Sequence, residues 1–240
     1  MYLMNLSMDS FREKLTKVNI AVLPVGMIEA HGRHCPLGTD MLIPRRFMEL
    51  LEEAAGDRII IAPEIPYGHS WSLSPFPGTL NLPSQVLGAY VYHVGLELKR
   101  WGLDKLMIFN GHGGNIPALR VAMEDLAAKG MTVVVINWWQ DFAPEILEIC
   151  QGQGHGGEDE TSTVLAIDED LVDMSKAGVN NLRTVVTAAW PGMEKETLPF
   201  AQTGDATQAS REKGEAIYAC IMPRLLELLT RLEQGQLATK

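Results

Sequence analysis

Acidic and histidine side chains gather early in the chain, in the segment from Glu29 to Asp40 (EAHGRHCPLGTD). Glu29 and His31 stand at positions i and i+2, so on an extended segment both side chains point to the same side. Asp40 follows at the start of a helical pattern. Carboxylates and imidazoles together are typical ligands of transition-metal ions. Glu29, His31 and Asp40 are therefore candidate metal ligands. Taken alone, Asp40 could simply cap the helix, since aspartate is a preferred N-cap.

Two later segments carry the same residue types. The run 110–115 (NGHGGN) places His112 directly after an apolar stretch, between glycines that let the backbone approach a ligand closely. Its spacing matches neither GxGxxG nor GxxxxGK[ST], which argues against a dinucleotide or phosphate loop. The run 154–162 (GHGGEDETS) supplies His155, Glu158 and Glu160 ahead of an apolar helical pattern. Acidic residues there could also serve only the helix dipole.

The charges of these residues are consistent with a two-metal site. Three carboxylates and one bridging hydroxide would balance two divalent cations, the carboxylates being Glu29, Asp40 and Glu158. His31 and His112 remain as neutral ligands, and this mixed nitrogen and oxygen set suits zinc, manganese or iron better than calcium or magnesium. Such a pair of cations polarises a carbonyl group and generates hydroxide at neutral pH, which is the chemistry of hydrolysis. His155 is then free to shuttle protons.

Short apolar runs alternate with helical patterns along the chain and must position these residues. The runs predict β-strands over 18–25, 58–62, 105–110, 131–137 and 182–188. The helical patterns predict helices over 40–55, 84–100, 116–129 and 211–232, the last disturbed at Pro223. This alternation indicates an α/β protein with a mostly parallel sheet covered by helices on both faces, formed as one domain over residues 1–240. Ligands bind beyond the carboxyl ends of such strands, so the loops that carry the candidate residues should converge at one edge.

Composition excludes several other classes. The 240 residues are 46% hydrophobic and carry a net charge of −10 without a basic cluster, which argues against nucleic acid and anionic membranes as partners. No apolar run approaches the roughly 18 residues of a membrane span, and the first residues lack a signal-peptide core, so we expect a cytoplasmic protein.

The three cysteines fit reduced thiols. No GxSxG nucleophile elbow is present. A Cys35–His34 nucleophile is disfavoured because neighbouring side chains in an extended loop diverge.

Four segments together resemble the creatininase (creatinine amidohydrolase) family. They occur in the family's order, and the resemblance spans roughly residues 18–230; the segments are 23–40 (LPVGMIEAHGRHCPLGTD), 76–79 (FPGT), 110–115 (NGHGGN) and 155–162 (HGGEDETS). The resemblance implies a three-layer α/β/α fold with a dinuclear metal site, in which Asp40 bridges the cations. It further implies that Glu29 and His112 bind one cation, that His31 binds the other, and that His155 assists proton transfer. Assembly as a homo-oligomer, with a hexamer among the possibilities, is also implied.

The chain departs from the family pattern at two places. Creatininase has a glutamate ligand two residues after the histidine of the NGH motif, where this chain has Gly114. The resemblance then implies that Glu158 replaces it as the fifth ligand. Many relatives have a histidine shortly before the FPGT segment, where this chain has Leu73, so the substrate contacts differ. We expect contacts from Ser70, Trp71 and Trp138, with Trp139 a further candidate for the pocket wall.

The leading function is hydrolysis of a small polar substrate by a metal-bridging hydroxide. The family's usual bond is an amide C–N bond, often in a cyclic amide or a formamide. The alternatives are hydrolytic C–C ring opening of a diketo-cyclitol (an oxidised inositol) and a non-catalytic protein that binds metal or a small molecule. The motif differences do not support creatinine itself as the substrate.

Overall fold

Four parallel strands form the centre of the molecule in the computed structural model, which describes residues 1–182 and 184–238. The strands are β1 (Ile20–Val25), β2 (Ile60–Ile61), β3 (Lys105–Asn110) and β4 (Thr132–Asn137), and their order in the sheet is β2-β1-β3-β4. Val25 is in register with Asn110, and Asn110 with Asn137, so three strands end together at one edge. The loops that follow them start side by side.

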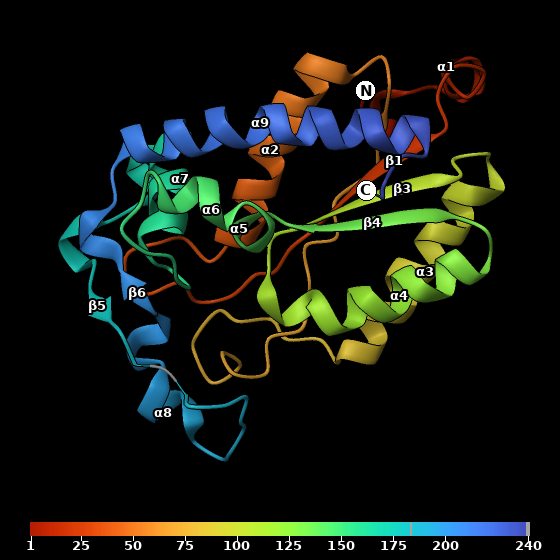
Figure 1. Cartoon of the computed structure of the whole chain (residues 1–240). Helices are drawn as coiled ribbons and strands as arrows, with labels where there is room; N and C mark the ends of the chain where they lie inside the picture. Colours follow the sequence, from red (N-terminus) through yellow and green to blue (C-terminus); the bar gives the residue numbers. More distant parts are fainter. Residues whose placement is uncertain (183, 239–240) are drawn as a thin grey trace.

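Helices cover both faces of this sheet (Figure 1). On one face lie α3 (Ser84–Arg100) and α4 (Ile116–Ala128), and on the other lie α2 (Thr39–Ala55) and α9 (Arg211–Gln234). Helix α7 (Glu158–Ile167) packs against both α2 and α9. The arrangement confirms the predicted three-layer α/β/α fold with a parallel sheet.

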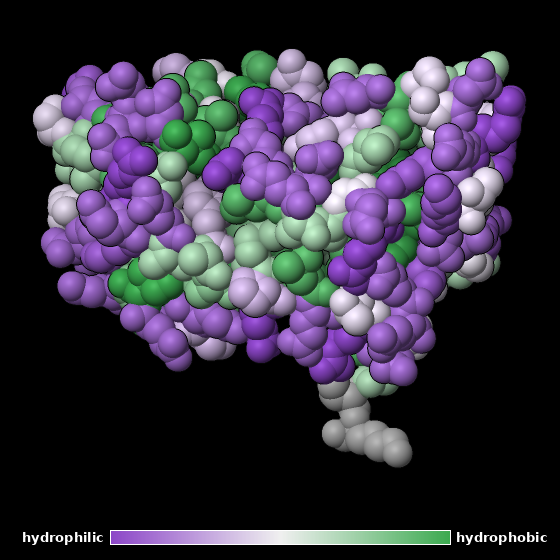
Figure 2. All heavy atoms as spheres, turned by 90° about the horizontal axis from the view of Figure 1, so that it is seen from above, coloured by the Kyte–Doolittle hydropathy of each residue, from purple (hydrophilic) through white to green (hydrophobic). Residues whose placement is uncertain are grey.

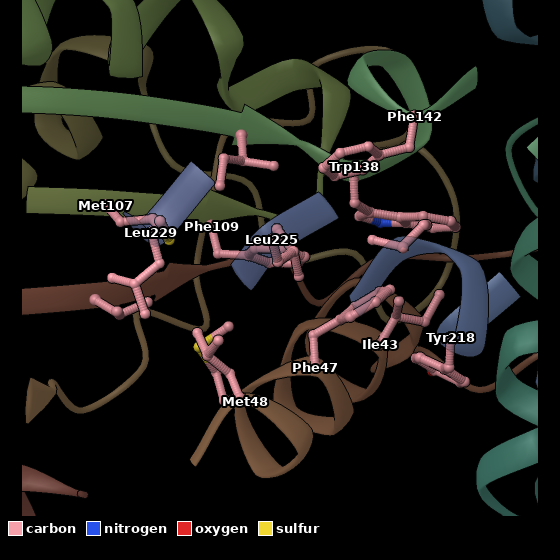
Figure 3. Packing of buried hydrophobic residues seen from close by; sticks show 14 of the residues in the cluster. Ile43, Phe47, Met48, Met107, Phe109, Trp138, Phe142, Tyr218, Leu225 and Leu229 are labelled. Atoms are coloured by element: carbon pink, nitrogen blue, oxygen red, sulfur yellow. The ribbon is translucent and has the colours of Figure 1, made fainter. Parts of the chain in front are cut away.

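Alternate residues of each strand enter two separate cores, one on each face. In β1, Ile20 and Val22 join the core beneath α2 and α9, whereas Ala21 and Leu23 join the core beneath α3 and α4. Burial on both faces explains why the strands read as continuous apolar runs. Figure 3 shows the first core, where Phe47 of α2 meets Trp138 and Tyr218.

The remaining elements are short and lie in the connections. The α-helices are α1 (Met8–Lys14), α5 (Trp138–Asp141), α6 (Ala143–Leu147) and α8 (Met193–Thr197), and a two-stranded antiparallel sheet joins β5 (Val179–Asn180) to β6 (Gly204–Asp205). Single 3-10 turns occupy Leu3–Asn5, Gly113–Asn115, Glu169–Leu171, Met174–Lys176, Pro199–Ala201 and Ala206–Gln208.

Most predicted elements are confirmed, and two predictions are wrong. The strand expected over 182–188 is absent from the described residues of that range, and Arg183 lies outside them. Val185 there is 100% exposed, and a β-branched run without a neighbouring strand has nothing to pair with. Helix α9 continues through Pro223 without a break, because Ile221 and Leu225 hold it to the core on either side.

Figure 2 views the molecule from the α9 side and shows a largely hydrophilic surface with smaller apolar patches. Within residues 1–182 and 184–238, no helix combines the length and apolarity that a bilayer crossing requires.

Candidate metal centre

Four of the five predicted ligand residues meet at the carboxyl edge of the sheet, namely Glu29, His31, Asp40 and His112. A cavity of about 370 Å³ opens there between the loops that follow β1, β3 and β4 and the start of α7. Its polar lining includes Glu29, Asp40, His112, His155 and Glu160. The loops converge as the strand order requires, because parallel strands present their carboxyl ends on the same side.

Two groups of potential ligands share one aspartate. In the first, His112 Nδ1 lies 3.1 Å from Glu29 Oε1 and 3.0 Å from Asp40 Oδ2. In the second, His31 Nε2 lies 2.9 Å from Asp40 Oδ1 and 3.5 Å from Glu160 Oε2. The ligand atoms within each group lie within 4.8 Å of one another. Asp40 thus presents one oxygen to each group.

Tight backbone packing fixes Asp40. A Cβ atom at Gly26 would lie 2.3 Å from the Asp40 carbonyl oxygen, and one at Gly111 would lie 2.1 Å from it. Only glycine lets the ends of β1 and β3 approach α2 this closely. The helix is capped by Gly38, and Asp40 lies in the first turn. Its carboxylate is therefore not the N-cap and faces the two histidines.

Each histidine of the cluster is oriented by a backbone carbonyl. The contacts are His31 Nδ1 to Glu29 O at 3.2 Å, His112 Nε2 to His69 O at 2.9 Å and His155 Nε2 to Ala30 O at 2.7 Å. A carbonyl oxygen only accepts, so each of these ring nitrogens donates its proton. The other nitrogen of each ring faces the carboxylates, where it can offer its lone pair to a bound cation. Metal-binding histidines typically show this arrangement.

The carboxylates lack the donors that buried oxygens require. Both carboxylate oxygens of Glu29 and Oδ2 of Asp40 are buried without a hydrogen-bond partner. An anionic oxygen in this state is costly unless a cation compensates it. The nitrogen and oxygen donors around it suit borderline transition metals. The residues therefore fit two divalent cations, one in each group.

Electrostatics at the site favour positive charge. Burial would lower the pKa of His31, but the carboxylates of Asp40, Glu160 and Glu29 outweigh it and raise this pKa to about 10. Burial raises the pKa of Glu160 to about 8 against the opposing effect of His31. His155 differs, because burial and the neighbouring His31 lower its pKa to about 4. The cluster thus attracts cations, while His155 is neutral at pH 7.

The structure places Glu158 outside both groups. Glu158 is ion-paired with Lys213 at 2.5 Å and accepts hydrogen bonds from the backbone amides of Gln151 and Gly152. Glu160, two residues further along α7, takes the position expected for Glu158. The sequence does contain a signal that favours Glu160. Val164 and Ile167 follow it by four and seven residues, so all three lie on one side of the helix, and the two apolar residues pack on the core.

Three residues expected to contact the substrate, Ser70, Trp71 and Trp138, lie outside the cavity lining. Trp138 is fully buried in the core beneath α2 and α9, and Trp139 lines the cavity instead, because consecutive side chains diverge. Ser70 is buried outside the cavity lining, and Trp71 is half exposed. The next two residues line the cavity in their place, namely Ser72 and Leu73, together with Leu198 from the segment before β6.

Comparisons with known proteins identify relatives of this chain. The family described as creatininase, creatinine amidohydrolase, matches residues 4–229. The chain is 31% identical to the creatinine amidohydrolase of Pseudomonas putida over 220 residues, covering 82% of this chain and 84% of that protein. It is 28% identical to the mycofactocin precursor peptide peptidase of Mycobacterium ulcerans (strain Agy99) over 224 residues, covering 89% and 86%. A solved manganese creatininase superposes with a TM-score of 0.84 at 27% identity, covering 97% and 98%.

Proposed function

The chain belongs to the creatininase family of hydrolases, and on that premise we propose that it uses two divalent cations to cleave an amide C–N bond. The bond belongs to a cyclic amide or a formamide in a small polar substrate. The observation that carries this proposal is the pair of ligand groups that share Asp40, with buried carboxylate oxygens lacking hydrogen bonds, beside a neutral histidine.

We assign one cation to each of the two ligand groups. Glu29, Asp40 and His112 would hold one cation, and His31, Asp40 and Glu160 would hold the other. Glu160 is thereby the fifth ligand in place of Glu158. When bound, zinc, manganese or iron in such a pair polarises a carbonyl oxygen and lowers the pKa of a water molecule.

We assign the proton transfer to His155. Its Nε2 is held by the Ala30 carbonyl, and its Nδ1 lies 3.5 Å from Glu29 Oε1. Its ring lies against that of His31, with ring centroids 4.1 Å apart, and 19% of its side chain is exposed toward the cavity. Nδ1 accepts a proton from the attacking water and returns it to the leaving nitrogen, as general acid–base catalysis requires. The C–O bond forms, the C–N bond breaks, and the proton moves from water to the amine.

The cavity limits the size of the substrate. Its volume of about 370 Å³ lies near the lower end of the range for small-molecule sites. Trp139, Leu73 and Leu198 provide apolar walls, and Ser72 adds a hydroxyl group. A small ring or a short acyl group fits a space of this size.

Metal analysis and a substrate screen test the proposal. Protein reconstituted with zinc, manganese or iron should bind two equivalents per chain and hydrolyse a lactam or a formamide. Asp40→Ala should lose both equivalents, and His155→Ala should keep both while losing turnover. Absence of bound metal after reconstitution would refute the metal centre. Turnover of ketonic cyclitols alone would assign the C–C bond instead, and bound metal without turnover in a broad screen would favour the binding protein.

A further inference from the structure

The ring orientation of His112 depends on a single backbone carbonyl. His112 Nε2 donates to His69 O at 2.9 Å, which turns Nδ1 toward Glu29 and Asp40 and makes it the nitrogen that can bind a cation. The opposite tautomer would direct an N–H group at the position where a cation must bind. The position of the His69 carbonyl therefore decides whether His112 can act as a ligand.

The amide group of Asn115 fixes the backbone of His69. Its Oδ1 accepts from the His69 amide at 2.9 Å, and its Nδ2 donates to Gly26 O at 3.0 Å and to Asn110 Oδ1 at 3.3 Å. The side chain of Asn115 is fully buried. It thus ties the loop before α3 to the ends of β1 and β3 without touching a proposed ligand side chain.

The backbone around this carbonyl leaves no room for adjustment. A Cβ atom at Gly114 would lie 2.0 Å from His69 O and 2.5 Å from His112 Nε2. A Cβ atom at Gly68 would lie 2.2 Å from Asn115 Oδ1. The carbonyl of His69 therefore fills the space that a side chain at position 114 would need.

We propose that Asn115 is a positioning residue for the metal centre: by holding His69 it selects the tautomer of His112 that presents Nδ1 to the cation. This inference rests on the proposed two-metal function, and it assigns a role to residues outside the ligand set. Carbonyl partners of metal-binding histidines contribute about 10–100-fold to metal affinity. Loss of the Asn115 side chain should therefore weaken one of the two sites and leave the other unchanged.

Cobalt binding tests this role without any substrate. We would measure stepwise Co²⁺ affinity by calorimetry and the visible Co²⁺ spectrum for the wild type, Asn115→Ala and His112→Ala. We expect Asn115→Ala to bind one Co²⁺ about 10–100-fold more weakly, at the same site whose spectrum His112→Ala loses. Asn115→Asp keeps the oxygen that accepts from His69, so it should recover part of that affinity.

A matched control lies in the same loop. Asn81 Oδ1 accepts from the amide of Ser70, the residue after His69, at 2.7 Å. Asn81→Ala removes a similar hydrogen bond one residue away and should bind both Co²⁺ ions as the wild type does.

Two outcomes separate this inference from the proposed function. If the wild type does not bind two Co²⁺ ions, the metal centre itself is refuted. If the wild type binds two and folded Asn115→Ala binds both with unchanged affinity and spectrum, only the positioning role is overturned. Should Asn115→Ala fail to fold, Gly114→Ala displaces the same carbonyl from the other side, and unchanged affinity in that folded variant would overturn the role equally.

Discussion

The two glutamates in the first turn of α7 should respond in opposite ways to replacement by glutamine. Glu160 Oε2 accepts from the Gly156 amide at 2.7 Å and lies 3.5 Å from His31 Nε2, inside the acidic cluster. Glu158 accepts from two backbone amides and pairs with Lys213. We therefore expect Glu160 to bind a cation and Glu158 to join α7 to α9.

Glu160→Gln should weaken metal binding without lowering the stability of the metal-free chain. The amide oxygen of glutamine can still accept from the Gly156 amide. Because burial raises the pKa of Glu160 to about 8, the substitution removes little charge from the metal-free chain at pH 7. Affinity for one cation should fall at least 10–100-fold, the range known for outer partners of metal ligands. That range equals a loss of about 1.4–2.8 kcal/mol of binding free energy.

Glu158→Gln should lower stability and leave metal binding intact. A hydrogen bond to a charged group contributes about 1.5–3 kcal/mol. The Lys213 side chain is 27% exposed and can turn toward water, so we expect a loss of about 1–2 kcal/mol in the free energy of unfolding. For a chain of this length that corresponds to a Tm lower by roughly 2–8 °C.

Two measurements on each variant complete the test. Calorimetric melting in the presence of EDTA gives the stability of the metal-free chain, and titration with Zn²⁺ or Mn²⁺ gives the affinity of each site. Loss of a cation in Glu158→Gln, with both cations retained in Glu160→Gln, would refute the assignment of these two residues.

Three further predictions test the core, the helix packing and the thiols. Trp138→Ala should lower the free energy of unfolding by about 3–5 kcal/mol in a denaturant titration. Trp139 is only partly buried against the same core, so Trp139→Ala should lower it less and should raise KM; equal stability losses would contradict their placement. Gly214→Ala should lower the Tm, because its Cβ would lie 1.9 Å from Ser162 O; an unchanged melting curve would contradict the packing of α7 on α9. Burial raises the pKa of Cys150 to about 12, so this thiol should resist alkylation at pH 8 until urea unfolds the chain, as peptide mass spectrometry would show.

The sheet could be predicted from the sequence because its strands are buried on both faces. The strands at 105–110 and 131–137 were located within one residue, since unbroken β-branched runs between glycine-bounded helices leave few alternatives. The run at 182–188 is also rich in β-branched residues, but none of its described residues pairs with a strand, and composition does not show whether a partner exists. Strand pairing depends on the tertiary structure, so the sequence alone could not exclude a strand in this peripheral connection.

The order of the strands also brought four of the predicted ligands together. Glu29, His31, Asp40 and His112 follow β1 and β3, and a loop after a parallel strand can only emerge at one edge of the sheet. Their convergence depends on topology, which the alternation of strands and helices indicates. It does not depend on the exact rotation of any helix.

Which of Glu158 and Glu160 faces the proposed metal site depends on the rotation of α7 about its own axis. At 100° per residue, two side chains at i and i+2 point to nearly opposite sides of a helix, so one faces the cluster and the other faces α9. The apolar residues Val164 and Ile167 mark the side of Glu160, but the signal is weak because residues 158–165 are all buried. A helix surrounded by protein has little amphipathic pattern from which to read its rotation. Lys213 supplies the missing information, because a buried glutamate beside α9 needs a cationic partner there, and this pairing leaves Glu160 as the carboxylate directed at His31 and Asp40.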